Sequence, residues 1–220
     1  MTSRKPTKEI DMKTLLQINS SLFGNGGQSS QLAERFVAKW KARNPRGIVI
    51  VRDLARDPVP HLTAERFGAF LAKPEERTVE QQAVIRYSDA LIDELKRADV
   101  IVLGLPMYNF GVPSALKAYF DHVARAGETF RYTANGPVGL LTGKEAHVFA
   151  TRGGAYAGTA RDSQTPFVRE FLNFVGIERV QFVYAEKLAM GDEHKQQALA
   201  AAHARIDGHA ADFAAEPLAA

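Results

Sequence analysis

Five short apolar runs recur along the chain, and segments with helical periodicity separate them. The runs are residues 14–18, 48–51, 100–105, 146–151 and 180–184. They are too short to form helices of their own and are rich in β-branched residues, as is typical of strands buried on both faces of a parallel sheet. Strands that alternate with helices in this way predict an α/β domain.

The segments between the runs place apolar residues three and four positions apart, which is the spacing of an amphipathic helix. We expect helices over 29–44, 64–71, 78–97, 115–124, 165–175 and 193–213. Three of these helices have an apolar stripe that should face the core. In helix 78–97 the stripe is Val84, Tyr87, Leu91 and Leu95, and in helix 115–124 it is Leu116, Tyr119, Phe120 and Val123. In helix 193–213 it is Leu199, Ala202, Ile206 and Phe213. Residues 128–132 alternate and precede a turn at 135–137, which predicts an extended excursion.

Five strands with these connections predict a flavodoxin-like α/β fold, a parallel sheet of order 2-1-3-4-5 with helices on both faces. Ligands bind to such sheets outside the carboxyl ends of the strands, where the strand order reverses. The loops with unusual composition follow the first, third and fourth strands. This topology brings them to one edge, so we expect Ser29, Asn109 and Gly153 to lie around a single crevice.

Composition limits the alternatives. The chain has 220 residues, of which 45% are hydrophobic and 24% charged, as is usual for a globular domain. Cysteine is absent, which excludes disulfides and thiolate chemistry and fits a cytoplasmic location. No apolar segment approaches the roughly 20 residues that cross a bilayer. We expect residues 1–11 to be a disordered tail without a secretory signal, and residues 12–220 to form one domain.

The charge pattern and the histidines exclude further classes. The net charge is +3, but no basic run suggests a nucleic-acid surface. A mildly positive surface would instead help to attract an anionic substrate. The six histidines show neither the HExxH spacing nor carboxylate clustering, so no metal site is expected. No Gly-x-Ser-x-Gly motif provides a serine nucleophile.

The loop after the first strand has the composition of an anion site. It leads into a helix N-terminus, whose free N–H groups and dipole favour negative charge, and it offers the hydroxyls of Ser20, Ser21, Ser29 and Ser30. A hydrogen bond to a charged group contributes about 1.5–3 kcal/mol, so several could hold a phosphate without lysine. The loop lacks the Gly-Lys-Ser/Thr of a nucleotide-binding P-loop and the third glycine of the dinucleotide fingerprint. FMN is therefore favoured over a nucleoside triphosphate, and the alternative is that these serines only cap the helix.

The other two loops suit the edge of a flavin ring. Asn109 offers both a donor and an acceptor, and Met107, Tyr108 and Phe110 can flank the ring. The segment of Thr151, Arg152, Gly153 and Gly154 offers a hydroxyl and exposed N–H groups near the pyrimidine end, where donors stabilise negative charge on a reduced ring. The alternatives are ordinary core and turn residues and, for Arg152, a solvated loop charge.

The motifs PMYNF (106–110), LKAYFD (116–121), ARAG (124–127) and TFRY (129–132) resemble the FMN-dependent NADH-azoreductases, also called NAD(P)H:quinone oxidoreductases. The resemblance extends from residue 12 to about residue 213. It implies one FMN per subunit of a homodimer, with the flavin sites at the subunit boundary. It assigns the phosphate and ribityl contacts to Ser21, Gly27, Gln28 and Ser29, the ring contacts to residues 107–110 and 151–154, and the substrate pocket to Phe130, Tyr132 and residues 54–73.

The resemblance also implies a reaction. NADH or NADPH would deliver hydride to FMN and leave, and a quinone or azo compound would then take up the electrons. No protein residue is assigned as catalytic, because protons can come from solvent. The main alternative is a flavodoxin-type electron carrier without its own substrate pocket. Such carriers are usually strongly acidic, whereas this chain is mildly basic. A third alternative is a non-catalytic nucleotide-sensing module, which would be colourless when purified.

Overall fold

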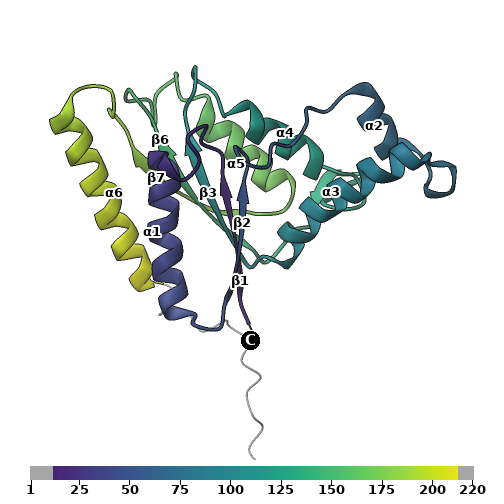
Figure 1. The fold of residues 1–220 in the computed structure, drawn as a ribbon, viewed down its shortest axis with the longest axis horizontal. Coiled ribbons are helices and arrows are strands. Elements are labelled where there is room, and N and C mark those ends of the chain that lie inside the picture. Colours follow the sequence, from purple (N-terminus) through teal and green to yellow (C-terminus); the bar gives the residue numbers. More distant parts are fainter. Residues whose placement is uncertain (1–11, 213–220) are drawn as a thin grey trace, which may run out of the picture.

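The computed structural model describes residues 12–212, so the predicted tail and the predicted inward position of Phe213 lie outside the described residues. The main sheet is parallel, with the order β2-β1-β3-β6-β7 (Figure 1). Its strands are β1 (Thr14–Asn19), β2 (Ile48–Asp53), β3 (Val100–Pro106), β6 (Glu145–Thr151) and β7 (Arg179–Ala185). The predicted order 2-1-3-4-5 is confirmed, and the numbering differs only because a separate hairpin contributes β4 and β5.

Helices cover both faces of this sheet (Figure 1). One face is covered by α1 (Gln28–Arg43) and α6 (Asp192–Asp212), and the other by α3 (Val79–Arg97), α4 (Ser114–Val123) and α5 (Gln164–Phe174). The short helix α2 (Ala64–Leu71) packs on α3 beyond the sheet. Two 3₁₀ turns, η1 (Gly24–Gly26) and η2 (Pro74–Glu76), complete the chain order. No helix within the described residues is long and apolar enough to span a membrane.

Each face of the sheet has its own apolar core, because successive side chains of a strand point to opposite faces. In β3, Val102 packs with the α1 and α6 side, whereas Ile101 and Leu103 pack with the α3–α5 side. The strand is buried at all seven positions, as its uninterrupted apolar sequence predicted. The predicted stripe of α4 is confirmed, since all four of its residues are buried.

The inward face of α3 is rotated from the predicted one. The buried residues are Ile85, Ser88, Leu91, Ile92 and Leu95, while Val84 and Tyr87 are only half-buried. The hydrophobic pattern missed Ser88 because its hydroxyl is satisfied in the core, where it donates to the His122 carbonyl of α4 at 2.6 Å. A buried hydroxyl with a partner is tolerated where an unpaired one is not.

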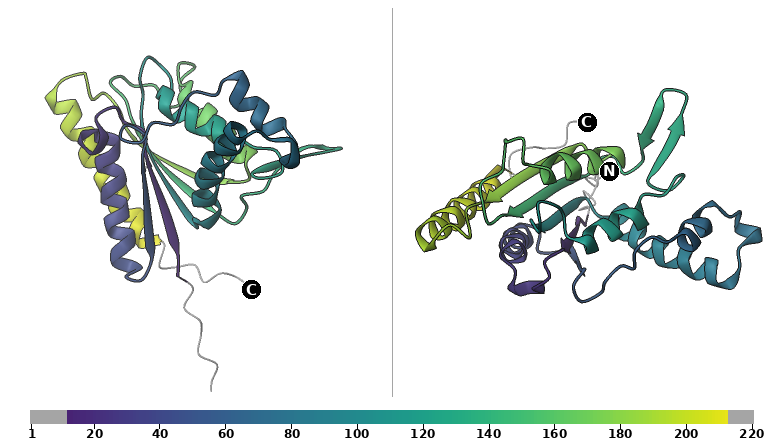
Figure 2. Two further views of the ribbon diagram at one scale, coloured as in Figure 1. Left: turned by 45° about the vertical axis from the view of Figure 1, so that its right-hand side comes forward. Right: turned by 90° about the horizontal axis from the view of Figure 1, so that it is seen from above.

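The predicted extended excursion is an antiparallel hairpin of β4 (Phe130–Thr133) and β5 (Gly136–Gly139). It projects from the body of the domain (Figure 2). Phe130 anchors its base, with its ring centroid 4.4 Å from that of Phe174 in α5. The tip of the hairpin is exposed, so this chain supports the hairpin only at one end.

Candidate functional site

The loops after β1, β3 and β6 meet at the carboxyl edge of the sheet. The Tyr108 hydroxyl shares a hydrogen bond with the Ser21 hydroxyl at 3.4 Å and accepts one from the Leu22 N–H at 3.2 Å. On the other side, the Met107 N–H donates to the Thr151 carbonyl at 2.9 Å. These contacts join all three loops at this edge of the sheet, as the strand order predicted, and we call this meeting place the crevice.

The N-terminus of α1 has unused hydrogen-bonding capacity. Gly27 is its N-cap and offers no side chain, and the N–H groups of Gln28, Ser29 and Ser30 have no acceptor in the part of the chain that is described. The hydroxyls of Ser29 and Ser30 are buried and also lack a partner there. Each unsatisfied buried group costs about 1–3 kcal/mol. An anion with several oxygens would satisfy these donors, so the residues present fit a phosphate.

Two glycines determine how closely the elements approach at this end. A Cβ atom on Gly27 would lie 2.1 Å from the Ser21 hydroxyl oxygen, so a side chain there would force Ser21 to move. A Cβ atom on Gly104 of β3 would lie 3.2 Å from the Ser29 carbonyl oxygen, which is why α1 can begin directly against β3. The Ser20 hydroxyl donates to the Gly104 carbonyl at 2.7 Å. The expectation that Ser20 offers its hydroxyl to a ligand is therefore wrong.

The loop after β3 is a tight two-residue hairpin. Tyr108 and Gly111 exchange backbone hydrogen bonds of 3.2 and 3.0 Å, and the two residues between them, Asn109 and Phe110, have φ angles of 49° and 64°. Positive φ at both central positions is the geometry of a type I′ turn. Asn tolerates it, whereas a side chain such as that of Phe110 loses about 1–2 kcal/mol in this region. Strain of this kind concentrates at ligand-binding segments.

Two residues at the start of α5 hold this hairpin. The buried Gln164 side chain donates from Nε2 to the Pro106 carbonyl at 2.9 Å and to the Gly111 carbonyl at 3.3 Å. The Ser163 hydroxyl donates to the Phe110 carbonyl. The sequence analysis missed both residues, because they are more than 50 positions away along the chain. The only local signal was a polar Ser-Gln pair at a helix start.

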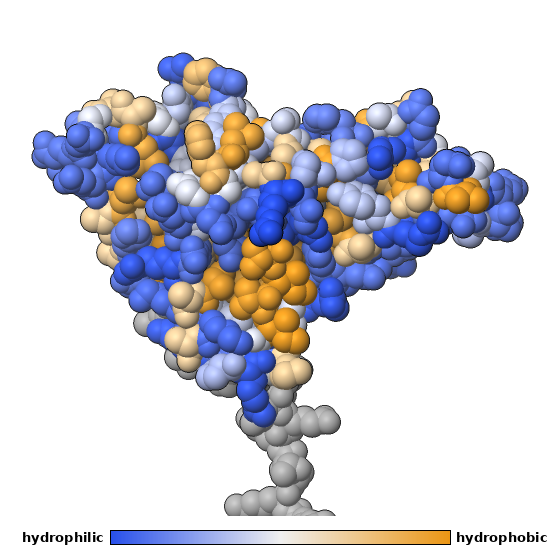
Figure 3. Space-filling view, viewed as in Figure 1, coloured by the Kyte–Doolittle hydropathy of each residue, from blue (hydrophilic) through white to orange (hydrophobic). Residues whose placement is uncertain are grey.

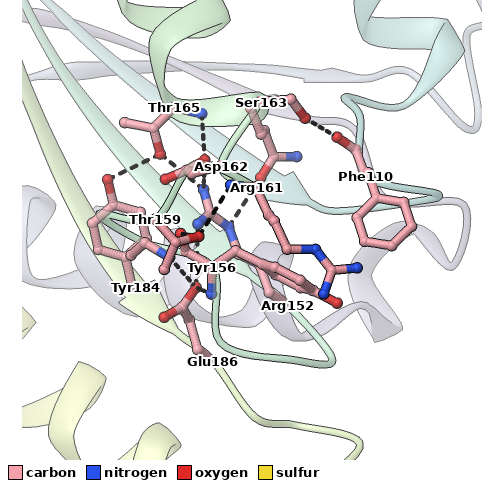
Figure 4. Close-up of polar contacts among 12 residues, drawn as sticks. Phe110, Arg152, Tyr156, Thr159, Arg161, Asp162, Ser163, Thr165, Tyr184 and Glu186 are labelled. Atoms are coloured by element: carbon pink, nitrogen blue, oxygen red, sulfur yellow. Dashed lines mark hydrogen bonds and ion pairs between the residues drawn. The ribbon is translucent and has the colours of Figure 1, made fainter.

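Arg152 lies in a buried network rather than at the surface (Figure 4). Its guanidinium donates to Asp162 at 3.0 Å, Thr165 at 2.8 Å, Glu186 at 3.2 Å and Gln164 at 3.4 Å. Burial acts to raise the pKa of the Asp162 carboxyl, but hydrogen bonds from Thr165 and Arg152 outweigh it and lower that pKa. The interpretation of Arg152 as a solvated loop charge is wrong.

The backbone of Arg152 is occupied as well, since its N–H donates to the Ala185 carbonyl at 2.9 Å. Four of the five guanidinium N–H groups also donate within the protein, which leaves one, on Nη1, for the expected cofactor contact. Arg152 instead ties the segment after β6 to α5 and to the loop after β7.

The two glycines after Arg152 present free donors. The carbonyls of Gly153 and Gly154 accept from Ala189 and Lys187 at 3.1 and 2.9 Å, whereas their own N–H groups have no acceptor among the described residues. Thr151 lies two residues before Gly153 and is buried. Residues 151–154 therefore have the hydroxyl and N–H groups that the sequence predicted for contact with the edge of a flavin ring.

The predicted pocket residues Phe130 and Tyr132 lie on the projecting hairpin, away from the three loops (Figure 2). Phe130 is 7% exposed and packs in the core, whereas Tyr132 is 74% exposed. Within one chain, the structure does not bring them to the crevice. Among residues 12–212, no group of three or more His, Asp or Glu side chains is arranged to hold a metal ion.

Comparison with known protein families matches residues 12–210 to a family whose description is "flavodoxin-like fold". The chain belongs to this flavodoxin-like family. It is 57% identical over 196 residues to an FMN-dependent NADH:quinone oxidoreductase of Cellvibrio japonicus (strain Ueda107), covering 89% of this chain and 98% of the relative. A protein of the same name from Alcanivorax borkumensis is 55% identical over 192 residues, covering 87% and 97%.

Solved structures show the same flavodoxin-like architecture. An FMN-dependent NADH-azoreductase from Bacillus anthracis str. Ames Ancestor, determined in complex with FMN, has a TM-score of 0.83 at 28% identity and covers 92% of this chain and 99% of its own. An azoreductase from Bacillus anthracis str. Sterne has a TM-score of 0.84 at 24% identity, covering 92% and 100%. The fold likeness thus extends over nearly the whole of each chain.

Proposed function

We propose that this protein is an FMN-dependent NAD(P)H:quinone oxidoreductase that also cleaves azo compounds reductively. The observation that carries the proposal is the meeting of three loops that together offer unsatisfied donors for a phosphate and a strained aromatic-amide turn for a ring. The two curated relatives above carry FMN-dependent NADH:quinone oxidoreduction in their names and are matched over almost their full length, whereas the two solved structures above are named azoreductases. Their names specify NADH, which makes NADH the first donor to test.

The residues divide the binding of FMN between two ends. Ser29 and the N–H groups of Gln28 and Ser29 would hold the phosphate, in a loop shaped by Ser21 and Gly27. The residues that would hold the ring are Met107, Tyr108, Asn109 and Phe110 on one loop, with Thr151, Gly153 and Gly154 on the other. When bound, FMN supplies a ring that takes up two electrons from a nicotinamide and passes them to an acceptor.

The protein residues bind, orient and tune rather than react. Free N–H groups on Gly153 and Gly154 favour negative charge beside them, which is how a protein shifts the potential of a flavin. Arg152 contributes by fixing the position of that segment through its hydrogen bonds to Glu186 and Asp162. No side chain is assigned as a general acid, because the protons can be supplied by solvent.

The proposal includes a homodimer in the cytoplasm, where NADH and NADPH are regenerated, built from one domain per chain. Exposed apolar side chains offer surface for a second copy. Ile48 and Val51 lie on the edge strand β2, where Figure 3 shows apolar surface, and Phe67 and Leu71 lie on α2. Tyr132 on the hairpin would then complete the pocket of the partner. Light scattering on the purified protein tests this part, and a monomer would refute it.

Absorbance and turnover of the purified protein test the activity. The expected result is a flavin spectrum whose cofactor is FMN, with NADH consumed on addition of a quinone and no other protein present. A colourless protein that does not take up added FMN would refute flavin binding. Flavin-loaded protein that oxidises NADH only with a partner protein would mean an electron carrier instead.

A further inference from the structure

Three side chains beside the loops after β3 and β6 form a cluster, of which the proposed function uses only Phe110. We call Phe110, Tyr156 and Arg161 the mouth cluster. The rings of Phe110 and Tyr156 meet edge to face with centroids 5.7 Å apart. The Arg161 guanidinium carbon lies 5.3 Å from the Phe110 centroid and 5.9 Å from that of Tyr156. Figure 4 shows Arg161 extended beside the Phe110 ring.

The mouth cluster joins two of the loops proposed to hold the ring. Phe110 belongs to the strained hairpin after β3. Tyr156 packs on the glycine segment after β6, where a Cβ atom on Gly154 would lie 2.7 Å from the tyrosine hydroxyl. The N–H groups of Tyr156 and Ala157 donate to the Glu186 carboxylate at 2.8 and 2.9 Å, which fixes the backbone beside the cluster. The cluster is therefore placed by both loops and by the Arg152 network.

Arg161 has no acidic partner among the described residues, although a carboxylate is its neighbour in sequence. Asp162 is taken by Arg152 at 3.0 Å and by the Thr165 N–H at 3.0 Å. Two aromatic rings hold the Arg161 guanidinium instead. Contact with ring faces leaves the in-plane N–H donors of a guanidinium available, and that planar fork matches carboxylates, sulfonates and phosphates.

We propose that Arg161 is a specificity-determining residue that binds an anionic group carried directly on the aromatic ring of the electron acceptor. This inference rests on the proposed function and names a substrate class for the same site. The rings of Phe110 and Tyr156 offer apolar surface to the acceptor ring, and Arg161 binds the carboxylate or sulfonate attached to it. The phosphates of a nicotinamide dinucleotide are separated from its reacting ring by a ribose and fit this compact arrangement less well.

Steady-state kinetics with a matched pair of acceptors test the inference. 1,4-Naphthoquinone and its 2-sulfonate are compared in the wild type, Arg161→Gln and Arg161→Lys. The control is Arg179→Gln, which removes the same charge at the amino end of β7, the opposite edge of the sheet. For Arg161→Gln we expect KM for the sulfonate to rise about tenfold, with the KM values for the neutral quinone and NADH within about twofold. The KM of Arg161→Lys for the sulfonate should lie between those of the wild type and Arg161→Gln. The control should match the wild type with both quinones.

A binding measurement separates this inference from the proposed function. Calorimetry on the FMN-loaded protein compares naphthalene-2-sulfonate with 2-naphthol, neither of which can be reduced by the enzyme. A selective loss of sulfonate affinity in Arg161→Gln, weaker at high salt, supports the inference even if the wild type reduces no quinone. Equal effects on both ligands, no effect, or a rise only in KM for NADH would overturn it.

Discussion

Replacing Arg152 with methionine removes a buried cation and keeps a long unbranched side chain, which ends about two atoms short of the guanidinium nitrogens. The Arg152 side chain is fully buried and donates to two carboxylates, those of Asp162 and Glu186. Asp162 is itself almost fully buried. The variant would therefore leave carboxylates inside the protein without their cation, while methionine fills most of the volume. The predicted loss is electrostatic rather than a cavity effect.

The size of the effect follows from this geometry. Breaking a buried ion pair by removing one partner costs about 3–5 kcal/mol. The total stability of a domain is about 5–15 kcal/mol, so the variant should fold but with little margin. Since 1 kcal/mol shifts the Tm of a domain of this size by about 2–4 °C, the expected fall is roughly 6–20 °C. An exposed ion pair would contribute only about 0–1 kcal/mol.

The effect should depend on pH with a definite sign. Burial tends to raise the pKa of Asp162, but hydrogen bonds from Thr165 and Arg152 lower it overall. A carboxyl whose pKa is lower in the folded state adds stability above its unfolded pKa, about 3.9, and that stability is lost as the pH falls through the folded value. The gap between wild type and Arg152→Met should be full at neutral pH. The gap should narrow as the pH falls below about 4, the pKa of an unfolded aspartate, towards the lower folded pKa of Asp162.

Urea unfolding of the FMN-free protein, followed by circular dichroism at pH 7 and at low pH, measures this gap. The control is Arg179→Met, because Arg179 is exposed and its pair with Glu145 is 3.9 Å long. The control should change the free energy of unfolding by less than about 1 kcal/mol. The reasoning is refuted if Arg152→Met also stays below that value at pH 7, or if its effect grows as the pH falls.

Substitutions at three further residues, with one control, test the crevice. Ser29→Ala should weaken FMN binding about tenfold or more without destabilising the FMN-free protein, since it removes an unpartnered buried hydroxyl; titration and urea unfolding measure the two effects. Gly27→Ala places a Cβ atom 2.1 Å from the Ser21 oxygen and should lower FMN affinity, whereas Gly26→Ala points into open space and should not. Asn109→Ala and Asn109→Gly should both weaken FMN retention or shift its potential, and the glycine variant removes the side chain without strain at positive φ. Wild-type flavin content and turnover in both would mean that Asn109 does not contact the ring.

The sheet could be predicted because its information is local and repeated. Each strand is a continuous apolar run between helices, and right-handed βαβ connections leave few possible strand orders. The same topology then placed the loops after β1, β3 and β6 together without any contact being known. The hydroxyl of Ser29 and the turn at Asn109 were found this way, since they lie in the connections that follow the carboxyl ends of β1 and β3.

The interactions that hold the loops could not be predicted, because they join distant positions. Gln164 reaches the Pro106 carbonyl 58 residues away, and Arg152 reaches Glu186 34 residues away. In the sequence, Arg152 follows a strand and precedes two glycines, which is equally the pattern of an exposed loop charge. Only the packing of α5 and the loop after β7 over it shows that it is buried. Hydrophobic periodicity carries no information on such polar networks.

Several features that contradict local preference lie where the three loops meet. Within residues 12–212, α1 begins without a capping side chain, the buried hydroxyls of Ser29 and Ser30 lack partners, and Phe110 occupies the left-handed region. Together they cost several kcal/mol on typical values, which a fold selected for stability alone would avoid. A phosphate at the helix N-terminus removes the first two costs on binding, because it accepts from the same donors. Arg152 and Gln164 hold the loops in this geometry beforehand, so the free energy gained from the ligand need not be used to order them.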